Sequence, residues 1–148
     1  MLSRKSNYIL LLVVLNGVLT ALFAVFGKYI FEDARSILGI TFALILFFLY
    51  ELFVILFTEN KYKDISPRQS VNLFLGFKAG KIILSLLFIV IYAVIVKVEF
   101  MRFLLVFVIL YLIYLLFDTI YLVSREKSLK KKQYKLKEIE KVSNYYKK

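Results

Sequence analysis

Four long apolar runs dominate this sequence, and each is long enough to cross a lipid bilayer as a helix. They lie at residues 8–26, 37–57, 78–96 and 103–123. A helix rises about 1.5 Å per residue, so roughly 20 residues cross the hydrocarbon core. Hydrophobic residues make up 61% of the chain, more than a soluble domain usually contains. The sequence therefore predicts an all-α integral membrane protein whose four-helix transmembrane domain, residues 1–123, is built from two hairpins.

The third run is the shortest, because its uncharged part covers only residues 82–96. A helix of that length spans about 22 Å, which is less than the hydrocarbon thickness. We therefore expect the third helix to begin near Lys78 or earlier and to carry Lys78 and Lys81 into the headgroup zone. Pro67 lies in the polar stretch before it, which is typical of a turn-rich connection.

The distribution of Lys and Arg predicts the orientation of the helices. Basic residues resist translocation and therefore gather in cytoplasmic segments. They are frequent at the N-terminus, between the second and third runs, and after residue 123, and sparse in the other two loops. Both termini are therefore expected in the cytoplasm. The first run follows Arg4 and Lys5 as a signal peptide would, but it is longer than a usual signal-peptide core and lacks a clear cleavage site.

The chain contains no Cys and no His. Disulfides, thiolate chemistry, imidazole bases and the commonest metal ligands are thereby excluded. The sequence also lacks a Gly-rich phosphate loop and a D-x-D pair of carboxylates. We therefore expect a protein that is not an enzyme and that has neither a cofactor nor a metal site.

A few charged residues lie inside the apolar runs, and they cluster at one depth. The expected helix directions place them all in the cytoplasmic half of the bilayer: Glu51, Lys78, Lys81 and Asp118. Ionisable groups in hydrocarbon cost free energy unless they are paired. We therefore expect Glu51 to pair with Lys81, and Asp118 to pair with Lys78 or Lys81. The alternative is that both lysines extend to the headgroups and the acids form local hydrogen bonds.

The fourth run has a polar stripe, because its polar residues are spaced three and four apart and share one helical face. The stripe consists of Tyr111, Tyr114, Asp118, Tyr121 and Arg125. It either bonds to the other helices of this chain or faces a partner in the same membrane. In the first run, Asn16 and Thr20 are typical of hydrogen bonds between membrane helices.

The segment 124–148 is a basic tail that we expect to continue the fourth helix into the cytoplasm. It contains ten Lys and Arg against three Glu. Basic residues directly after a membrane helix are typical of contact with anionic lipids. The candidates for lipid binding are Arg125, Lys127, Lys130, Lys131 and Lys132. Fixing the orientation, binding a protein partner and binding RNA are the alternatives, and no stacking platform or RNA motif favours RNA.

One stretch resembles a known family. Residues 76–123, which include GFKAGKIILSLLFIVIYAVIVKVEFMRFLLVFVILYLIYLLFDTIYL, look like the ATP synthase I subunit family, with Lys78 or Lys81 at the position of the family's helix-three lysine. The resemblance implies a bacterial inner-membrane protein that helps to assemble or stabilise the rotary ring of the F-type ATP synthase. Magnesium transport has also been suggested for the family, but two lysines beside the only intramembrane acids would repel a divalent ion.

The sequence leads to three functional hypotheses. The first is a non-enzymatic accessory or assembly subunit whose polar transmembrane helix faces recognise partner membrane proteins, with ATP synthase membrane subunits as the named candidate. The second is a small ion channel or carrier that works as a homo-oligomer, because four short helices leave little room for an internal pathway. The third is a structural subunit of another membrane complex. Membrane lipids are expected partners in every case.

Overall fold

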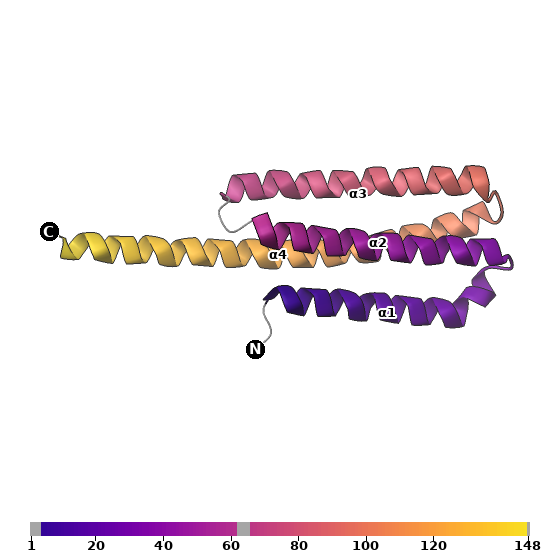
Figure 1. The fold of residues 1–148 in the computed structure, drawn as a ribbon, viewed down its shortest axis with the longest axis horizontal. Helices are drawn as coiled ribbons and strands as arrows, with labels where there is room; N and C mark the ends of the chain where they lie inside the picture. The colour runs from indigo at the N-terminus through magenta and orange to yellow at the C-terminus, as the bar shows by residue number, and fades with distance from the viewer. Residues whose placement is uncertain (1–3, 62–65, 148) are drawn as a thin grey trace.

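The computed structural model describes residues 4–61 and 66–147 and, over these residues, contains four α-helices (Figure 1). They are α1 (Arg4–Ile30), α2 (Ala34–Lys61), α3 (Pro67–Ile95) and α4 (Phe100–Tyr146). All four are long and apolar enough to cross a membrane. Helices suit this environment because they satisfy their backbone hydrogen bonds internally. Over the described residues the predicted all-α fold is confirmed, with four helices that are long and apolar enough to span a membrane.

The sequence predicts a third helix that begins near Lys78 or earlier, and α3 begins at Pro67, well before Lys78. Pro67 suits the first turn, where no N–H donor is needed, and Ser66 precedes it with extended backbone angles. Hydropathy marks the part of a helix that lies in hydrocarbon, whereas helical hydrogen bonding continues into the headgroup region. As a result Lys81 lies near the middle of α3, away from both ends.

Helix α2 lies at the centre of the arrangement and contacts α1, α3 and α4, while α4 also packs against α3. Two ends can be distinguished in Figure 1. The start of α1, the end of α2, the start of α3 and the projecting part of α4 lie at one end, here called the tail end. The α1–α2 and α3–α4 connections lie at the other, here called the loop end.

Stacked aromatic rings fill the space between α2, α3 and α4. The rings of Tyr92 and Phe103 are parallel with centroids 3.5 Å apart, and Phe47 packs against Phe107 at 5.3 Å. Gly39 allows the close approach of α2 to this stack. A Cβ atom at Gly39 would lie 2.6 Å from a ring carbon of Tyr92, so any larger residue would displace the ring.

Helix α4 is 47 residues long and continues without a break past the other helices (Figure 1). Every residue from 130 to 147 is exposed. The prediction that the basic tail continues the fourth helix is confirmed. The tail therefore stands as a single projecting helix, unlike the packed part of α4 inside the bundle.

Candidate functional site: a buried charge cluster

A charged cluster lies in the interior of the bundle, where three helices meet. Lys81 of α3 donates hydrogen bonds to Glu51 of α2 and to Oδ2 of Asp118 of α4, the latter at 2.8 Å. Lys81 is 0% exposed, Glu51 1% and Asp118 6%. We call Glu51, Lys81 and Asp118 the charge triad. The structure thus brings together three of the four charged residues that the sequence placed at one depth.

Aromatic rings surround the ammonium group of Lys81. Its Nζ atom lies 5.6 Å from the ring centroid of Tyr114, 5.8 Å from that of Phe47 and 6.0 Å from that of Tyr111. Ring faces carry negative electrostatic potential and attract cations at these distances. The rings and the two carboxylates therefore all attract the ammonium group of Lys81.

Lys78 does not join the triad. Its Nζ atom lies 5.0 Å from the ring centroid of Phe74, and it forms no ion pair with a described residue. Of the two predicted partners of Asp118, the structure therefore selects Lys81. Lys78 is one turn nearer the tail end and remains partly exposed.

The polar stripe of α4 faces the other helices of this chain. Tyr114 is fully buried, and its hydroxyl donates to Oδ1 of Asn16 in α1 at 2.9 Å. Asp118 belongs to the charge triad. Tyr111 is partly buried and packs against Phe47. Of the two alternatives for the stripe, the structure shows inward hydrogen bonds for Tyr114, Asp118, Tyr121 and Arg125, whereas contact of the stripe with a partner stays a prediction. The hydroxyl of Thr20, by contrast, donates to the backbone carbonyl of Asn16 in the same helix.

The stripe ends in a second ion pair near the tail end. Nη1 of Arg125 lies 2.6 Å from Oε1 of Glu59, to which the hydroxyl of Tyr121 also donates at 3.3 Å. The ring of Tyr8 packs edge-on against Tyr121. Glu59 was not among the residues predicted from the sequence, although its position eight residues after Glu51 places it near the same helix face. This pair contains one acid and one base.

The ion pair with Glu59 also changes the set of candidate lipid ligands. The side chain of Arg125 is only 12% exposed, so it is held by the bundle and does not point freely to headgroups. Lys130 pairs with Glu126 one turn away at 2.8 Å on the surface. The other three candidates, Lys127, Lys131 and Lys132, are exposed.

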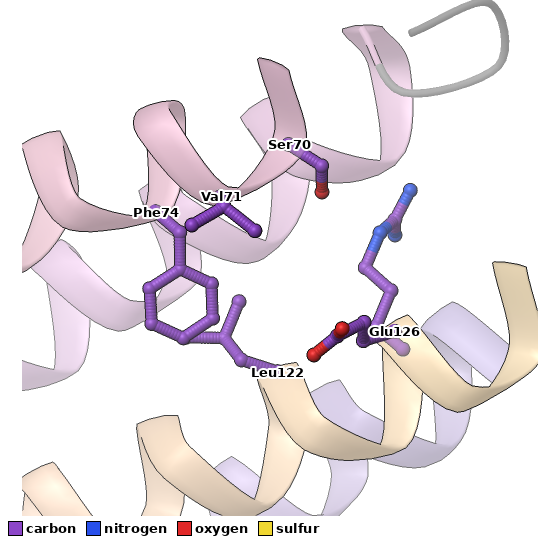
Figure 2. A pocket seen from close by; sticks show the side chains of 6 residues that line it. Ser70, Val71, Phe74, Leu122 and Glu126 are labelled. Atoms are coloured by element: carbon purple, nitrogen blue, oxygen red, sulfur yellow. The ribbon is translucent and has the colours of Figure 1, made fainter. Parts of the chain in front are cut away.

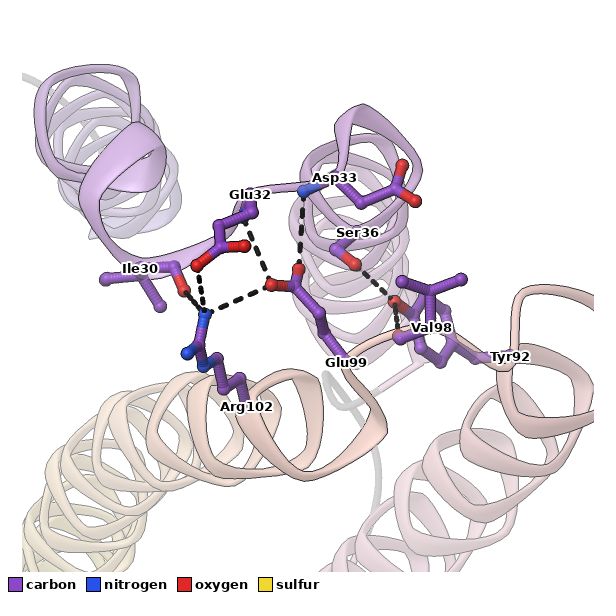
Figure 3. Close-up of polar contacts among 8 residues, drawn as sticks. All are labelled: Ile30, Glu32, Asp33, Ser36, Tyr92, Val98, Glu99 and Arg102. Carbon is purple, nitrogen blue, oxygen red and sulfur yellow. Dashed lines mark hydrogen bonds and ion pairs between the residues drawn. The ribbon is translucent and has the colours of Figure 1, made fainter.

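A polar network at the loop end was not foreseen (Figure 3). Glu99 has a left-handed backbone, and its carboxylate accepts hydrogen bonds from the N–H groups of Glu32 at 3.2 Å and Asp33 at 3.5 Å. Arg102 lies 3.1 Å from the same carboxylate. The N–H of Glu32 is the main reason that the pKa of Glu99 lies below its usual value. Glu99 thus ties the α3–α4 loop to the α1–α2 loop.

Two small hollows lie in series along the seam of α3 and α4, one near the tail end and one beside the triad, and we call them together the crevice. Its outer hollow is lined by Ser70, Arg125 and Glu126, among others (Figure 2), and its inner hollow reaches Asp118. Phe74 and Leu122 line both hollows, so they stand between the outside and the triad.

The charge triad and its surroundings contain charged side chains, but the sequence has no Cys or His that could act there as a nucleophile, a base or a metal ligand. No cluster of three or more metal-binding side chains occurs among residues 4–61 and 66–147. No protein-family model matches the chain, and no match is found among curated proteins or solved structures. The functional argument therefore rests on the geometry of the triad, the crevice and the projecting tail.

Proposed function

We propose that this chain is a non-enzymatic accessory or assembly subunit of a complex in the bacterial inner membrane. In this proposal the tail end faces the cytoplasm, because Lys and Arg concentrate there. The bundle anchors the protein in the bilayer, and the tail contacts the partner. We assign recognition to the tail and not to the polar stripe, since the hydrogen bonds of the stripe lie within the bundle.

The projecting tail is the observation that supports this proposal. Isolated helices gain little stability from their own hydrogen bonds, and packing usually supplies the rest. The tail has exposed apolar side chains, including Leu136, Ile139 and Val142, at 58%, 66% and 56% exposure. Together with the excess of basic residues, this surface suits a protein partner with an acidic face. A continuous straight helix also carries the distal basic residues away from the bilayer, beyond the reach of the headgroups.

The membrane part of the F-type ATP synthase is the named candidate partner. This choice rests on the resemblance of residues 76–123 to the ATP synthase I subunit family. A structural role in another membrane complex would use the same tail and the same orientation.

Co-purification from native membranes in a mild detergent tests the proposal. We expect the tagged full-length protein to bring down membrane subunits of the ATP synthase, identified by mass spectrometry. Recovery of a different membrane complex would transfer the accessory role to that complex. Recovery of this protein alone would contradict the proposal.

A pair of matched variants tests the role of the tail. Replacing Lys130, Lys131 and Lys132 by Gln should reduce partner recovery, because the replacement removes three exposed positive charges from the tail. The control replaces Lys28, Arg35 and Lys97 by Gln, which removes three exposed charges at the loop end. Equal recovery with both variants would contradict a docking role for the tail.

A small homo-oligomeric channel or carrier is the second candidate, and the crevice that leads to the triad favours it. Purified protein in proteoliposomes would then conduct ions, and the flux would fall when Phe74 is replaced by Trp. Absence of flux with wild-type protein would leave the accessory function as the better account.

A further inference from the structure

The charges of the triad do not balance. Glu51 and Asp118 contribute two carboxylates, and Lys81 contributes one ammonium. With all three ionised, the cluster carries one surplus negative charge at a place where all three residues are nearly inaccessible. A net charge in such surroundings is costly, and the usual response is to bind a proton or a counter-ion.

Among the described residues, no base other than Lys81 forms an ion pair with the triad carboxylates. Arg125 is bound to Glu59, and the ammonium of Lys78 lies against the ring of Phe74. Helix α1 has no charged residue between Lys5 and Lys28 and reaches this region through Asn16.

The other titratable groups that face the triad are tyrosines. Tyr50 of α2 donates its hydroxyl hydrogen to the backbone carbonyl of Phe77 at 2.5 Å. Tyr111 and Tyr114 of α4 present their rings to Lys81. A neutral phenol adds no positive charge, so these groups leave the surplus on the carboxylates.

A proton suits the site better than a metal ion. The ammonium of Lys81 already occupies the space between the two carboxylates, and it repels any second cation that approaches them. A proton needs no such space, because it forms an O–H bond on a carboxylate oxygen. The products are one carboxylic acid, one carboxylate and one ammonium, which together are neutral.

The crevice provides a route for this proton. The outer and inner hollows have cavity volumes of about 20 and 10 Å³, which leaves room for about one water molecule in each. Figure 2 shows Phe74 and Leu122 close together between α3 and α4. Beyond them the inner hollow is lined by Tyr50, Lys78 and Asp118.

We propose that the charge triad binds one exchangeable proton, shared between the carboxyl groups of Glu51 and Asp118, and that this proton exchanges with the tail end through the crevice. On binding, a hydronium ion in the crevice gives its proton to a carboxylate oxygen and leaves as water. Release is the reverse reaction. The proposal holds whether the protein is an accessory subunit or a carrier, because it concerns only the protonation of the site.

Infrared difference spectroscopy of the full-length protein in lipid vesicles tests the proposal. A protonated carboxyl group gives a C=O stretching band that a carboxylate lacks. We expect wild-type protein at neutral pH to show the band of one buried carboxylic acid. Asp118→Asn and Glu51→Gln should each lose it, because one acid and one base then balance. Glu59→Gln is the control and should keep the band. Absence of the band from wild-type protein, or its persistence in both triad variants, would overturn the proposal.

Two lysine variants exclude the remaining explanations. Lys81→Met should increase the band to that of two carboxylic acids, because no base then remains in the triad. Lys78→Met should leave the band unchanged. If the band were weak in wild type and appeared only in Lys78→Met, Lys78 would be the balancing charge and the proposal would fail. The wild-type, Glu51→Gln and Asp118→Asn spectra decide the question even if Lys81→Met does not fold.

The route is tested by transferring the vesicles to deuterated water, which shifts the band as the proton exchanges. Phe74→Trp should slow this shift, because the larger ring narrows the crevice. Leu75→Trp is the matched control, since Leu75 is the next residue on α3 and is 59% exposed. Equal exchange rates in the two variants would contradict the crevice as the route.

Discussion

The charge triad in the middle of the bundle and the network of Glu32, Glu99 and Arg102 at the loop end are each built from two acids and one base, but in opposite surroundings. The triad has two acids and one base, all buried. The network at the loop end has Glu32, Glu99 and Arg102, again two acids and one base. There the side chains of Glu32 and Arg102 are 86% and 53% exposed. Glu99 is also bound by backbone N–H groups.

The difference shows that burial, and not the number of charges, decides what an ionic cluster requires. At the loop end the solvent and the backbone stabilise the carboxylates of Glu32 and Glu99, and the exposed bases Lys28, Arg35 and Lys97 supply further positive charge. In the middle of the bundle none of these is available to a comparable degree, so the surplus must be removed by a proton. Each of the following predictions changes one side of this comparison.

The largest effect is expected from Lys81→Met. It leaves two carboxyl groups buried without their base, and breaking a buried ion pair in this way costs about 3 to 5 kcal/mol. Reversible unfolding in detergent would measure the loss. Arg102→Met at the loop end is the control and should cost less than about 1 kcal/mol, as exposed ion pairs do. Equal losses would contradict the distinction between the two clusters.

A smaller effect is expected from Gly39→Ala, which tests whether packing holds the helices together near the loop end. The added Cβ would lie 2.6 Å from the ring of Tyr92, so the stack with Phe103 must shift. Overpacking of this kind costs about 1 to 3 kcal/mol. Gly17→Ala is the control, because nothing lies within 4 Å of the added atom. Equal melting temperatures for Gly39→Ala and Gly17→Ala would contradict the packing argument.

Tyr114→Phe tests the neutral polar contact beside the triad. The change removes the donor to Asn16 and with it a hydrogen bond between α1 and α4. Such bonds between membrane helices contribute about 0.6 kcal/mol on average and at most about 1.7 kcal/mol. We therefore expect a loss of about 1 kcal/mol in unfolding. Tyr29→Phe, at an 85% exposed position, should show none.

The smallest effect is expected from Glu99→Gln, and it should depend on pH. The pKa of Glu99 is lowered in the folded protein, chiefly by the N–H of Glu32. A carboxylate with a lowered pKa stabilises the fold above its ordinary pKa, and the contribution disappears as the pH falls through the folded value. Melting temperatures of wild type and variant should therefore differ at neutral pH and converge in acid. A difference that stays constant with pH would contradict this role.

Much of the triad could be predicted from the sequence, because a charged residue in an apolar run needs a partner. The spacing of the runs placed Glu51, Lys81 and Asp118 at one depth. Hydropathy could not choose between Lys78 and Lys81, since residues three apart share a helix face. The structure shows that Lys81 is the partner of Asp118. Lys81 lies near the middle of α3 because this helix already begins at Pro67.

Two other features could not be predicted from the sequence, for different reasons. The periodicity of α4 identified a polar face but not what that face contacts, so the hydrogen bonds of Tyr114 and Arg125 to this chain's own helices were left open. Glu99 lies in a short loop with φ at 48°, and its role comes from the meeting of two loops that are distant in sequence. No periodic pattern in the sequence indicates that these two loops are in contact.

A double-mutant cycle between Lys81 and Glu51 tests most directly whether the membrane charges form one site. Unfolding free energies would be measured in detergent for Lys81→Met, Glu51→Gln and the double variant, with Lys81→Met and Glu59→Gln as the control cycle. We predict that Glu51→Gln recovers part of the loss caused by Lys81→Met, with a coupling of about 0.5 to 3 kcal/mol, as found for residues in contact. The control cycle should be additive. Additive losses in both cycles would contradict the triad.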